Sequence, residues 1–330
     1  MRMSIGHVAE LWRYPVKSLG GERLDHTDVG PRGVLGDRLW AVRDVAREVT
    51  ASARQLPVLL TATARYPAPV PPDAAPGNVP EVEITFPDGT VMSGSDDGVH
   101  AKLSEMAGRD VRLTALPPAN DTSLHKLTRA ERSETLSPTF VRASFGVADD
   151  EKLPDMSMVR VSDMVNFARY STPPGTFVDL APVHVLSQTS LATIGAAIGS
   201  DLDVRRFRPN VLLALDNPDD ELPESHWTGA RVDVGGVTLD IMMPTIRCVV
   251  PSRAQPGIEV DRRITKAVAV RAQRCLGVYC GVASGGTVRV GDDVSIRHPN
   301  AGRKVLADAG RRAKRLTFGL VTEATERFSR

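Results

Sequence analysis

The sequence predicts a mainly β fold with some α-helix. Aromatic residues make up only 5% of the 330 residues, whereas valine is frequent in short runs that Gly, Pro and Asp interrupt. Short apolar runs bounded by turn-forming residues are typical of strands joined by tight turns. The length corresponds to two domains or to one large domain. The sequence therefore predicts a β-rich chain that folds as two domains or as one large domain.

Four strands are expected in the first hundred residues, over 7–16, 37–45, 57–66 and 81–86. Gly20-Gly21 and Pro87-Asp88-Gly89 form turns between them. Residues 66–80 hold too many prolines for regular structure, so we expect a surface loop there. Residues 100–113 predict a short helix that ends at Gly108 and continues into a strand.

The middle of the chain, residues 118–178, contains the expected domain junction. A charged helix is expected over 123–136 and a loop over 170–179. A second strand-rich block follows, with strands at 183–187, 211–215, 230–243 and 247–250 and a helix over 190–199. Residues 277–296 predict a hairpin with Gly285-Gly286 at its turn. The expected divisions are 1–117, a linker or insert 118–178, 179–298, and a helical tail 299–330.

The composition limits the cellular context and the partners. A net charge of +1 gives no global field for nucleic-acid binding. The amino-terminal stretch lacks a signal-peptide core, and no window approaches the apolar length of a membrane span. Three cysteines without dense spacing suit a reducing compartment. We expect a cytoplasmic protein with no membrane span and no nucleic-acid partner.

Cys248 is the first candidate for chemistry, because it directly follows Arg247 at the end of an apolar run. A neighbouring cation favours the thiolate, which is the nucleophilic and metal-binding form of cysteine. The thiol could instead be a small buried apolar group. If both residues lay on a strand, their side chains would point to opposite faces. Cys275 and Cys280 match no redox or zinc spacing and are expected to pack in the core.

Basic residues beside turns are the second signal. Lys17 and Ser18 precede a Gly-Gly turn, Arg38 begins a strand, and the stretch RRFRPN (205–210) places three arginines around Phe207. Such groups bind phosphate. The chain lacks the minimum motifs of P-loop, Rossmann, serine-hydrolase and zinc sites. The residues therefore indicate an anionic ligand, with a cysteine that could hold a metal.

These segments together resemble a known family. LWRYPVKSLGGERLDHTDVGPRGVLGDRLWAVRD (11–44) resembles the β-barrel domain that precedes MOSC domains. RRFRPN (205–210), RCVVPSRAQPG (247–257) and LGVYCGVASGGTVRVGDDVSI (276–296) resemble successive signatures of the MOSC domain. The resemblance covers about residues 5–115 and 180–297. It implies an N-terminal β-barrel-like domain, a MOSC β-barrel domain and a C-terminal helix.

Two-domain MOSC proteins include the mitochondrial amidoxime-reducing components and bacterial relatives, so the resemblance implies the molybdenum cofactor, Mo-molybdopterin. It implies Cys248 as metal ligand and catalytic residue. It assigns cofactor contacts to Lys17, Ser18, Arg38, Ser190, Arg208, Asn210 and Arg247. A weak association with pyridoxal phosphate binding also belongs to the family. The segments Thr50–Gln55 and Ser252–Gly257 depart from the family pattern on the presumed substrate side.

The implied function is an oxidoreductase that reduces N-oxygenated small molecules. The chain has no iron–sulfur, flavin or nicotinamide motif, so electrons must come from a separate ferredoxin-, flavin- or cytochrome-type donor protein. That donor could dock on the basic stretch 311–315. Two alternatives remain: sulfur transfer through a persulfide on Cys248, and a non-catalytic cofactor carrier. We expect residues 118–178 to supply substrate-specific structure.

Overall fold

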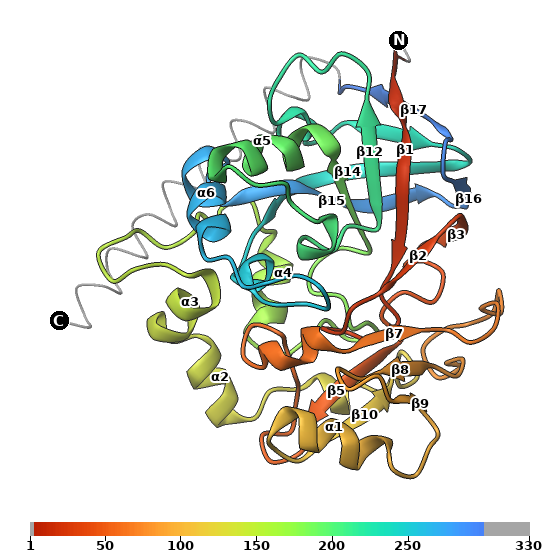
Figure 1. Ribbon diagram of the computed structural model, residues 1–330, viewed down its shortest axis with the longest axis vertical. Coiled ribbons are helices and arrows are strands. Elements are labelled where there is room, and N and C mark those ends of the chain that lie inside the picture. Colours follow the sequence, from red (N-terminus) through yellow and green to blue (C-terminus); the bar gives the residue numbers. More distant parts are fainter. Residues whose placement is uncertain (1–2, 300–330) are drawn as a thin grey trace.

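The structure is a computed structural model that describes residues 3–299, and a closed seven-stranded barrel forms its upper half in Figure 1. The strands follow the order β12-β11-β15-β14-β13-β17-β1, and β12 pairs back to β1. Their bounds are β1 (Met3–Arg13), β11 (Val183–Ser187), β12 (Val211–Leu215), β13 (Arg231–Val234), β14 (Val237–Ile246), β15 (Cys275–Ser284) and β17 (Asp293–Arg297). The first strand of the chain therefore closes a barrel that is otherwise built from its second half.

The apolar pattern of the strands explains the barrel core. Every second residue of β14 is buried, from Val237 to Thr245, as expected for a strand with one face inside. Val8 and Leu11 of β1 belong to the same cluster as Val232 and Val278. Cys280 is fully buried there, which confirms the core packing expected for it, whereas Cys275 is half-buried. Burial raises the pKa of both thiols.

Small sheets and one helix form the lower half (Figure 1). They pack around a second core that includes Val42, Leu59, Ile84 and Leu103. The strands of this half are β5 (Trp40–Asp44), β6 (Val49–Thr50), β7 (Thr63–Arg65), β8 (Glu83–Thr85), β9 (Val91–Ser93) and β10 (Val111–Ala115). The other short strands adjoin the barrel: β2 (Glu22–Leu24) pairs with β1, and β3 (His26–Gly30), β4 (Gly33–Val34) and β16 (Gly286–Arg289) form a small sheet that packs into the barrel core. The helix α1 (Val99–Ala107) ends at Gly108 with a left-handed φ of 65°, as the sequence predicts.

The remaining helices lie at the junction and on the barrel. α2 (Arg129–Thr135), α3 (Pro138–Phe145) and α4 (Val161–Phe167) come from the insert 118–178. Thr128 and Ser137 cap α2 and α3 with their side-chain oxygens. α5 (Gln188–Ile198) and α6 (Arg263–Arg271) pack against each other on the outside of the barrel (Figure 1).

Several expected elements differ from the structure. The expected strand 230–243 is two antiparallel strands, β13 and β14, and the expected helix 123–136 is a 3-10 helix over Ser123–His125 followed by α2. The expected strand 57–66 begins with a 3-10 helix, Pro57–Thr61, because Pro57 stands at its first turn. The expected hairpin over 277–296 is wrong: β16 pairs with β3, and the tight approach of Gly285 to Val29 lets the chain cross there. The strand expected over 247–250 is also wrong, since β14 ends at Ile246. The helical tail and the basic stretch 311–315 lie outside the described residues.

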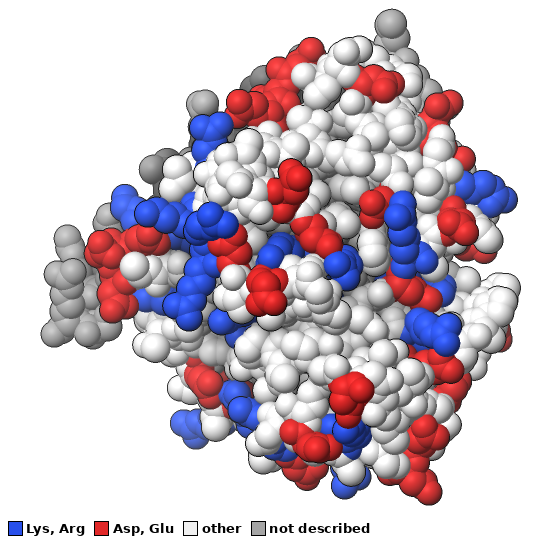
Figure 2. Space-filling model, in the orientation of Figure 1, with Lys and Arg blue, Asp and Glu red and all other residues white. Residues whose placement is uncertain are grey.

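The face of the molecule drawn in Figure 2 is not dominated by side chains of one charge. Basic and acidic side chains are interspersed over it, in keeping with the net charge of +1. Within residues 3–299, no helix combines the length and the apolar character that crossing a membrane requires.

Candidate functional site

A cavity of about 320 Å³ lies where the N-terminal region, the insert and the barrel meet. Among the described residues, six basic side chains line it: Lys17, Arg38, Arg54, Arg206, Arg208 and Arg247. Two carboxylates, Glu131 and Asp179, line it as well. Glu131 already accepts two hydrogen bonds from Arg47, at 2.7 and 2.8 Å. The lining therefore carries excess positive charge and suits an anionic ligand.

Cys248 opens onto this cavity together with Arg247. Both residues follow the end of β14, so the alternation of a strand no longer separates their side chains. The loop is held from both sides: the amide of Arg247 donates to Arg274 O at 2.8 Å, and the amide of Val249 donates to Ser144 O at 3.0 Å. The thiol is half-buried. The thiol is thus accessible to a ligand, and hydrogen bonds hold the loop that carries it in place.

Three residues around the cavity have a left-handed backbone. Ser18, Arg38 and Arg208 have φ values of 72°, 52° and 55°, which non-glycine residues rarely adopt. Ser18 and Arg38 are locked by neighbours: Ser18 Oγ accepts from the Ala53 amide at 3.0 Å, and Arg38 pairs with Asp37. Strained backbone tends to cluster at functional sites. Three residues that the sequence analysis selected thus line one cavity and share a left-handed backbone conformation.

Arg208 is the best placed of these for holding an anion. Its guanidinium lies 4.2 Å from the Tyr14 ring centre, and its Nη1 donates to Leu19 O at 2.5 Å. Its Nη2 is buried and has no hydrogen-bond partner within the described residues. Burial lowers the pKa of Arg208 to about 10, and nearby Arg38 contributes. The unused donor is available to a ligand oxygen.

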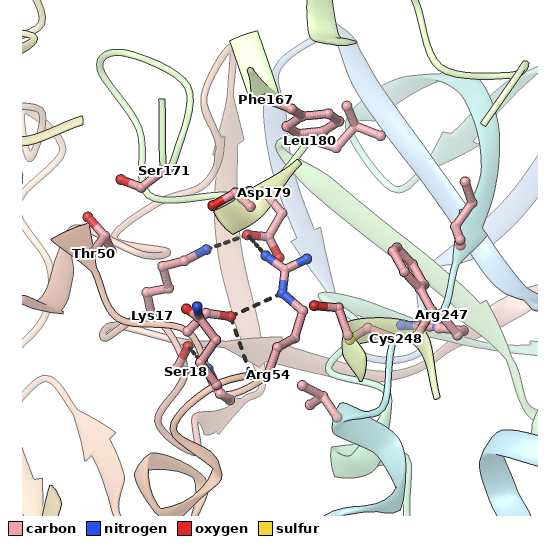
Figure 3. A pocket seen from close by; sticks show the side chains of 18 of the residues that line it. Lys17, Ser18, Thr50, Arg54, Phe167, Ser171, Asp179, Leu180, Arg247 and Cys248 are labelled. Atoms are coloured by element: carbon pink, nitrogen blue, oxygen red, sulfur yellow. Dashed lines mark hydrogen bonds and ion pairs between the residues drawn. The ribbon is translucent and has the colours of Figure 1, made fainter. Parts of the chain in front are cut away.

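Lys17, Arg54 and Asp179 form a charged cluster in the cavity (Figure 3). Lys17 Nζ donates to Asp179 Oδ1 at 2.5 Å and to Phe177 O at 3.0 Å, and Arg54 lies 3.7 Å from the same carboxylate oxygen. Burial lowers the pKa of Lys17. Burial alone would raise the pKa of Asp179, but Lys17 and Arg54 hold it well below its ordinary range. Asp179 is therefore ionised and partly neutralises the cluster.

Arg247 and His184 support the cavity wall. Arg247 donates from Nε to Leu276 O at 2.8 Å, from Nη1 to Phe207 O at 3.0 Å and from Nη2 to His184 Nε2 at 2.8 Å. His184 Nδ1 lies 3.3 Å from the Arg208 carbonyl. Burial, reinforced by the charge of Arg247, lowers the pKa of His184 far below its ordinary value. The imidazole is thus neutral, with Nδ1–H donating and Nε2 accepting.

Ser190 and Asn210 do not line the cavity. Ser190, in the first turn of α5, donates from Oγ to Glu224 Oε2 at 2.7 Å. Asn210 Oδ1 accepts from the His184 amide at 3.1 Å, and its Nδ2 donates to Trp12 O at 3.3 Å. Both side chains are buried and engaged with protein groups. The structure therefore does not bring these two side chains to the cavity with the other residues selected from the sequence.

Many lining residues escaped the sequence prediction of the site, among them Arg54, Asp179, His184 and Tyr279. Arg54 lies in the stretch Thr50–Gln55, which the sequence marked only as a departure from the family pattern. Asp179 ends the loop expected over 170–179, and His184 and Tyr279 sit on apolar strands. Burial raises the pKa of Tyr279 to about 12. Only the acidic residue at the end of a loop offered a readable signal.

Comparisons with known families agree with this architecture. Residues 5–110 match the family model of the MOSC N-terminal beta barrel domain, and residues 173–295 match that of the MOSC domain. MOSC domains are associated with binding of the molybdenum cofactor. Most of the insert lies between the two matched regions.

Curated relatives match along most of the chain. Mitochondrial amidoxime reducing component 2 of Rattus norvegicus is 23% identical over 88% of this chain and 83% of its own. Mitochondrial amidoxime-reducing component 1 of Mus musculus is 25% identical over 88% and 82%. The crystal structure of the YUAD protein from Bacillus subtilis covers 91% of this chain and 99% of its own, at 12% identity and a TM-score of 0.43. The chain belongs to the two-domain MOSC proteins, in which a MOSC N-terminal barrel domain precedes a MOSC domain.

Proposed function

We propose that the protein is a molybdenum-cofactor-dependent oxidoreductase that reduces N-oxygenated small molecules with electrons from a separate donor protein. One observation carries the proposal. The Cys248 thiol opens onto the same cavity as Lys17, Arg38 and Arg208, although these residues come from distant parts of the chain. A soft sulfur ligand beside a cationic pocket is what a phosphorylated metal cofactor requires.

The residues in the cavity fit such a group. The buried Arg208 Nη2 lacks a partner within the described residues and can donate to a phosphate oxygen. Arg38 lies close enough to lower the pKa of Arg208, and Lys17 lines the same cavity. Cys248 Sγ would be the protein ligand of the metal, since the thiolate binds soft metal centres. When bound, the molybdenum cofactor supplies a redox centre that accepts oxygen from an N–O bond.

Reduction of an N–OH group to N–H releases water and consumes two electrons and two protons. The pKa of His184 and that of Asp179 are both lowered, so both groups are deprotonated near neutral pH and are poor proton donors. We therefore assign the protons to solvent that reaches the cavity. We assign the electrons to a second protein, because the sequence has only 3 cysteines and no four-cysteine iron–sulfur pattern.

Elemental analysis of protein expressed with molybdate tests the proposal. We expect wild type and the matched control Cys275→Ala to retain stoichiometric molybdenum, and Cys248→Ala to lose it. The loaded wild type should reduce an N-hydroxylated amidine with a chemical reductant. Metal-free protein carrying a persulfide on Cys248 would support sulfur transfer instead. Bound molybdenum without turnover on any N-hydroxylated compound would support a cofactor carrier.

A further inference from the structure

The cavity has two chemically different walls. Its basic lining residues all come from the N-terminal region and the barrel, whereas the insert 118–178 contributes mainly apolar ones. Four aromatic residues of the insert line the cavity: Phe140, Phe145, Phe167 and Tyr170. The whole chain has only 8 phenylalanines and 4 tyrosines, so aromatic rings are concentrated at this wall.

Basic and aromatic side chains of the insert lie on different surfaces. Its seven basic residues, among them Arg129, Arg132 and Arg160, do not line the cavity, and most are exposed. The four aromatic residues instead line the cavity, and all four are half-buried. Apolar surface left uncovered inside a concave site commonly receives the apolar part of a ligand. Among the charged side chains of the insert only Glu131 lines the cavity within the described residues, and its carboxylate is bound by Arg47.

This aromatic wall begins beside Cys248. The carbonyl of Ser144 on α3 accepts from the Val249 amide at 3.0 Å, and the carbonyl of Phe145 accepts from Arg274 Nη1 at 3.3 Å. The first bond joins the C-terminal end of α3 to the loop that carries the thiol, and the second joins it to the residue before β15. Figure 3 shows the other end of the wall, where Phe167 and Leu180 lie above Asp179. A ligand bound at Cys248 would therefore meet aromatic rings directly.

We propose that the insert selects substrates whose N-oxygenated group is attached to a planar aromatic body. The aromatic body packs against Phe140, Phe145, Phe167 and Tyr170, and the N–O group points toward Cys248. Aromatic rings favour offset or edge-to-face contacts with other rings, which gives such a wall its preference over aliphatic groups of equal polarity. The inference rests on the proposed function for the identity of the reacting N–O group. The selectivity for an aromatic body follows from the side chains of the insert and does not depend on that function.

Binding of two oximes to the purified holoprotein tests the inference without turnover. Benzaldehyde oxime and acetaldehyde oxime share the C=N–OH group and differ in phenyl against methyl, and calorimetry without reductant gives both dissociation constants. We expect wild type to bind the phenyl compound at least about tenfold more tightly. Phe140→Ala and Phe167→Ala should each lose about tenfold on the phenyl compound and little on the methyl compound.

Leu136→Ala is the matched control, because Leu136 belongs to the same insert, is exposed and does not line the cavity. Phe167→Leu keeps apolar volume and should lose affinity for the phenyl compound alone, which separates ring recognition from a folding defect. Equal affinity of wild type for both oximes, or equal losses in the variants, overturns the inference. Phenyl selectivity without any turnover under reductant would reject the reductase function and leave the aromatic wall standing.

Discussion

At the scale of single residues, His184 connects the two arginines that matter most for the cavity. Its Nε2 accepts from Arg247 and its Nδ1 lies against the Arg208 carbonyl. Arg208 depends on that support, because its left-handed backbone is not intrinsically favourable. A protonated imidazole would turn an N–H toward the Arg247 guanidinium and repel it. The network therefore holds only while the histidine is neutral.

This arrangement predicts a pH-dependent stability. The folded pKa of His184 lies below its unfolded value of about 6.5, so the unfolded chain binds more protons between the two values. The stabilisation that neutral His184 adds to the free energy of unfolding is fully present above about pH 6.5. It is lost as the pH falls toward the folded pKa, by up to about 1.4 kcal/mol per pH unit. Urea unfolding at pH 7.5 and 5.5 measures it.

His184→Gln should reduce this loss, because glutamine keeps an amide donor and acceptor without titrating. The matched control is His7→Gln, which replaces an exposed histidine on β1. A wild-type protein and a His184→Gln variant that lose equal stability between the two pH values would refute the assignment of a neutral, supporting imidazole.

The residues of the cavity also show what a sequence can reveal about a site. Lys17, Arg38, Arg208 and Cys248 were selected because each combines a reactive or charged group with a turn or a strand end, and all four line the cavity. Ser190 and Asn210 were selected by position in a motif, and the structure does not bring them to the cavity. Arg54 and Asp179 meet Lys17 through distant parts of the chain, which no local pattern encodes.

At the scale of elements, helix α3 controls the loop that carries Cys248. Gly146 ends this helix with φ of 61°, and a Cβ there would lie 3.0 Å from Val249 Cγ1 and Thr265 Cγ2. Gly108 ends α1 with φ of 65°, and a Cβ there would meet nothing within 4 Å. The two caps share one backbone conformation and differ in what surrounds them.

The comparison of the two glycines gives a prediction. Gly108→Ala should lower the free energy of unfolding by about 1 kcal/mol, the cost of a left-handed non-glycine residue. Gly146→Ala should cost about 1–3 kcal/mol more, because Val249 and Thr265 must move. It should also accelerate alkylation of Cys248 in cofactor-free protein, and mass spectrometry gives that rate. Equal stability losses with unchanged alkylation would show that α3 does not fix the thiol loop.

Elements were predictable where their pattern is local. The period-two burial of β14 and the helix stop at Gly108 both follow from neighbouring residues. The hairpin expected over 277–296 was wrong because the partner of β16 is β3, more than 250 residues earlier in the chain. Helices α3 and α4 are short and were missed, since their apolar faces are only partly buried against the protein.

At the scale of the whole molecule, the two halves share strands. β1 pairs with β12 and with β17 in antiparallel fashion and closes the barrel. Gly6 of β1 approaches β12 so closely that a Cβ would lie 2.0 Å from Ala214 O. Without β1, the edges of β12 and β17 would be unpaired, and unpaired edges promote misfolding and aggregation. The MOSC half is therefore incomplete as a fold when it starts after the N-terminal region.

A pair of fragments tests this dependence. Residues 118–299 alone should be poorly soluble and lack the near-ultraviolet circular dichroism of a packed Trp227, which is buried in the barrel core. The matched fragment appends residues 3–13 after residue 299 through a short turn. Because Met3 pairs with Ile296 across antiparallel strands, the added segment can form a hairpin with β17 and restore closure. We expect it to regain the dichroism signal and a cooperative unfolding transition, whereas a well-folded fragment without residues 3–13 would mean that β1 is dispensable for the barrel.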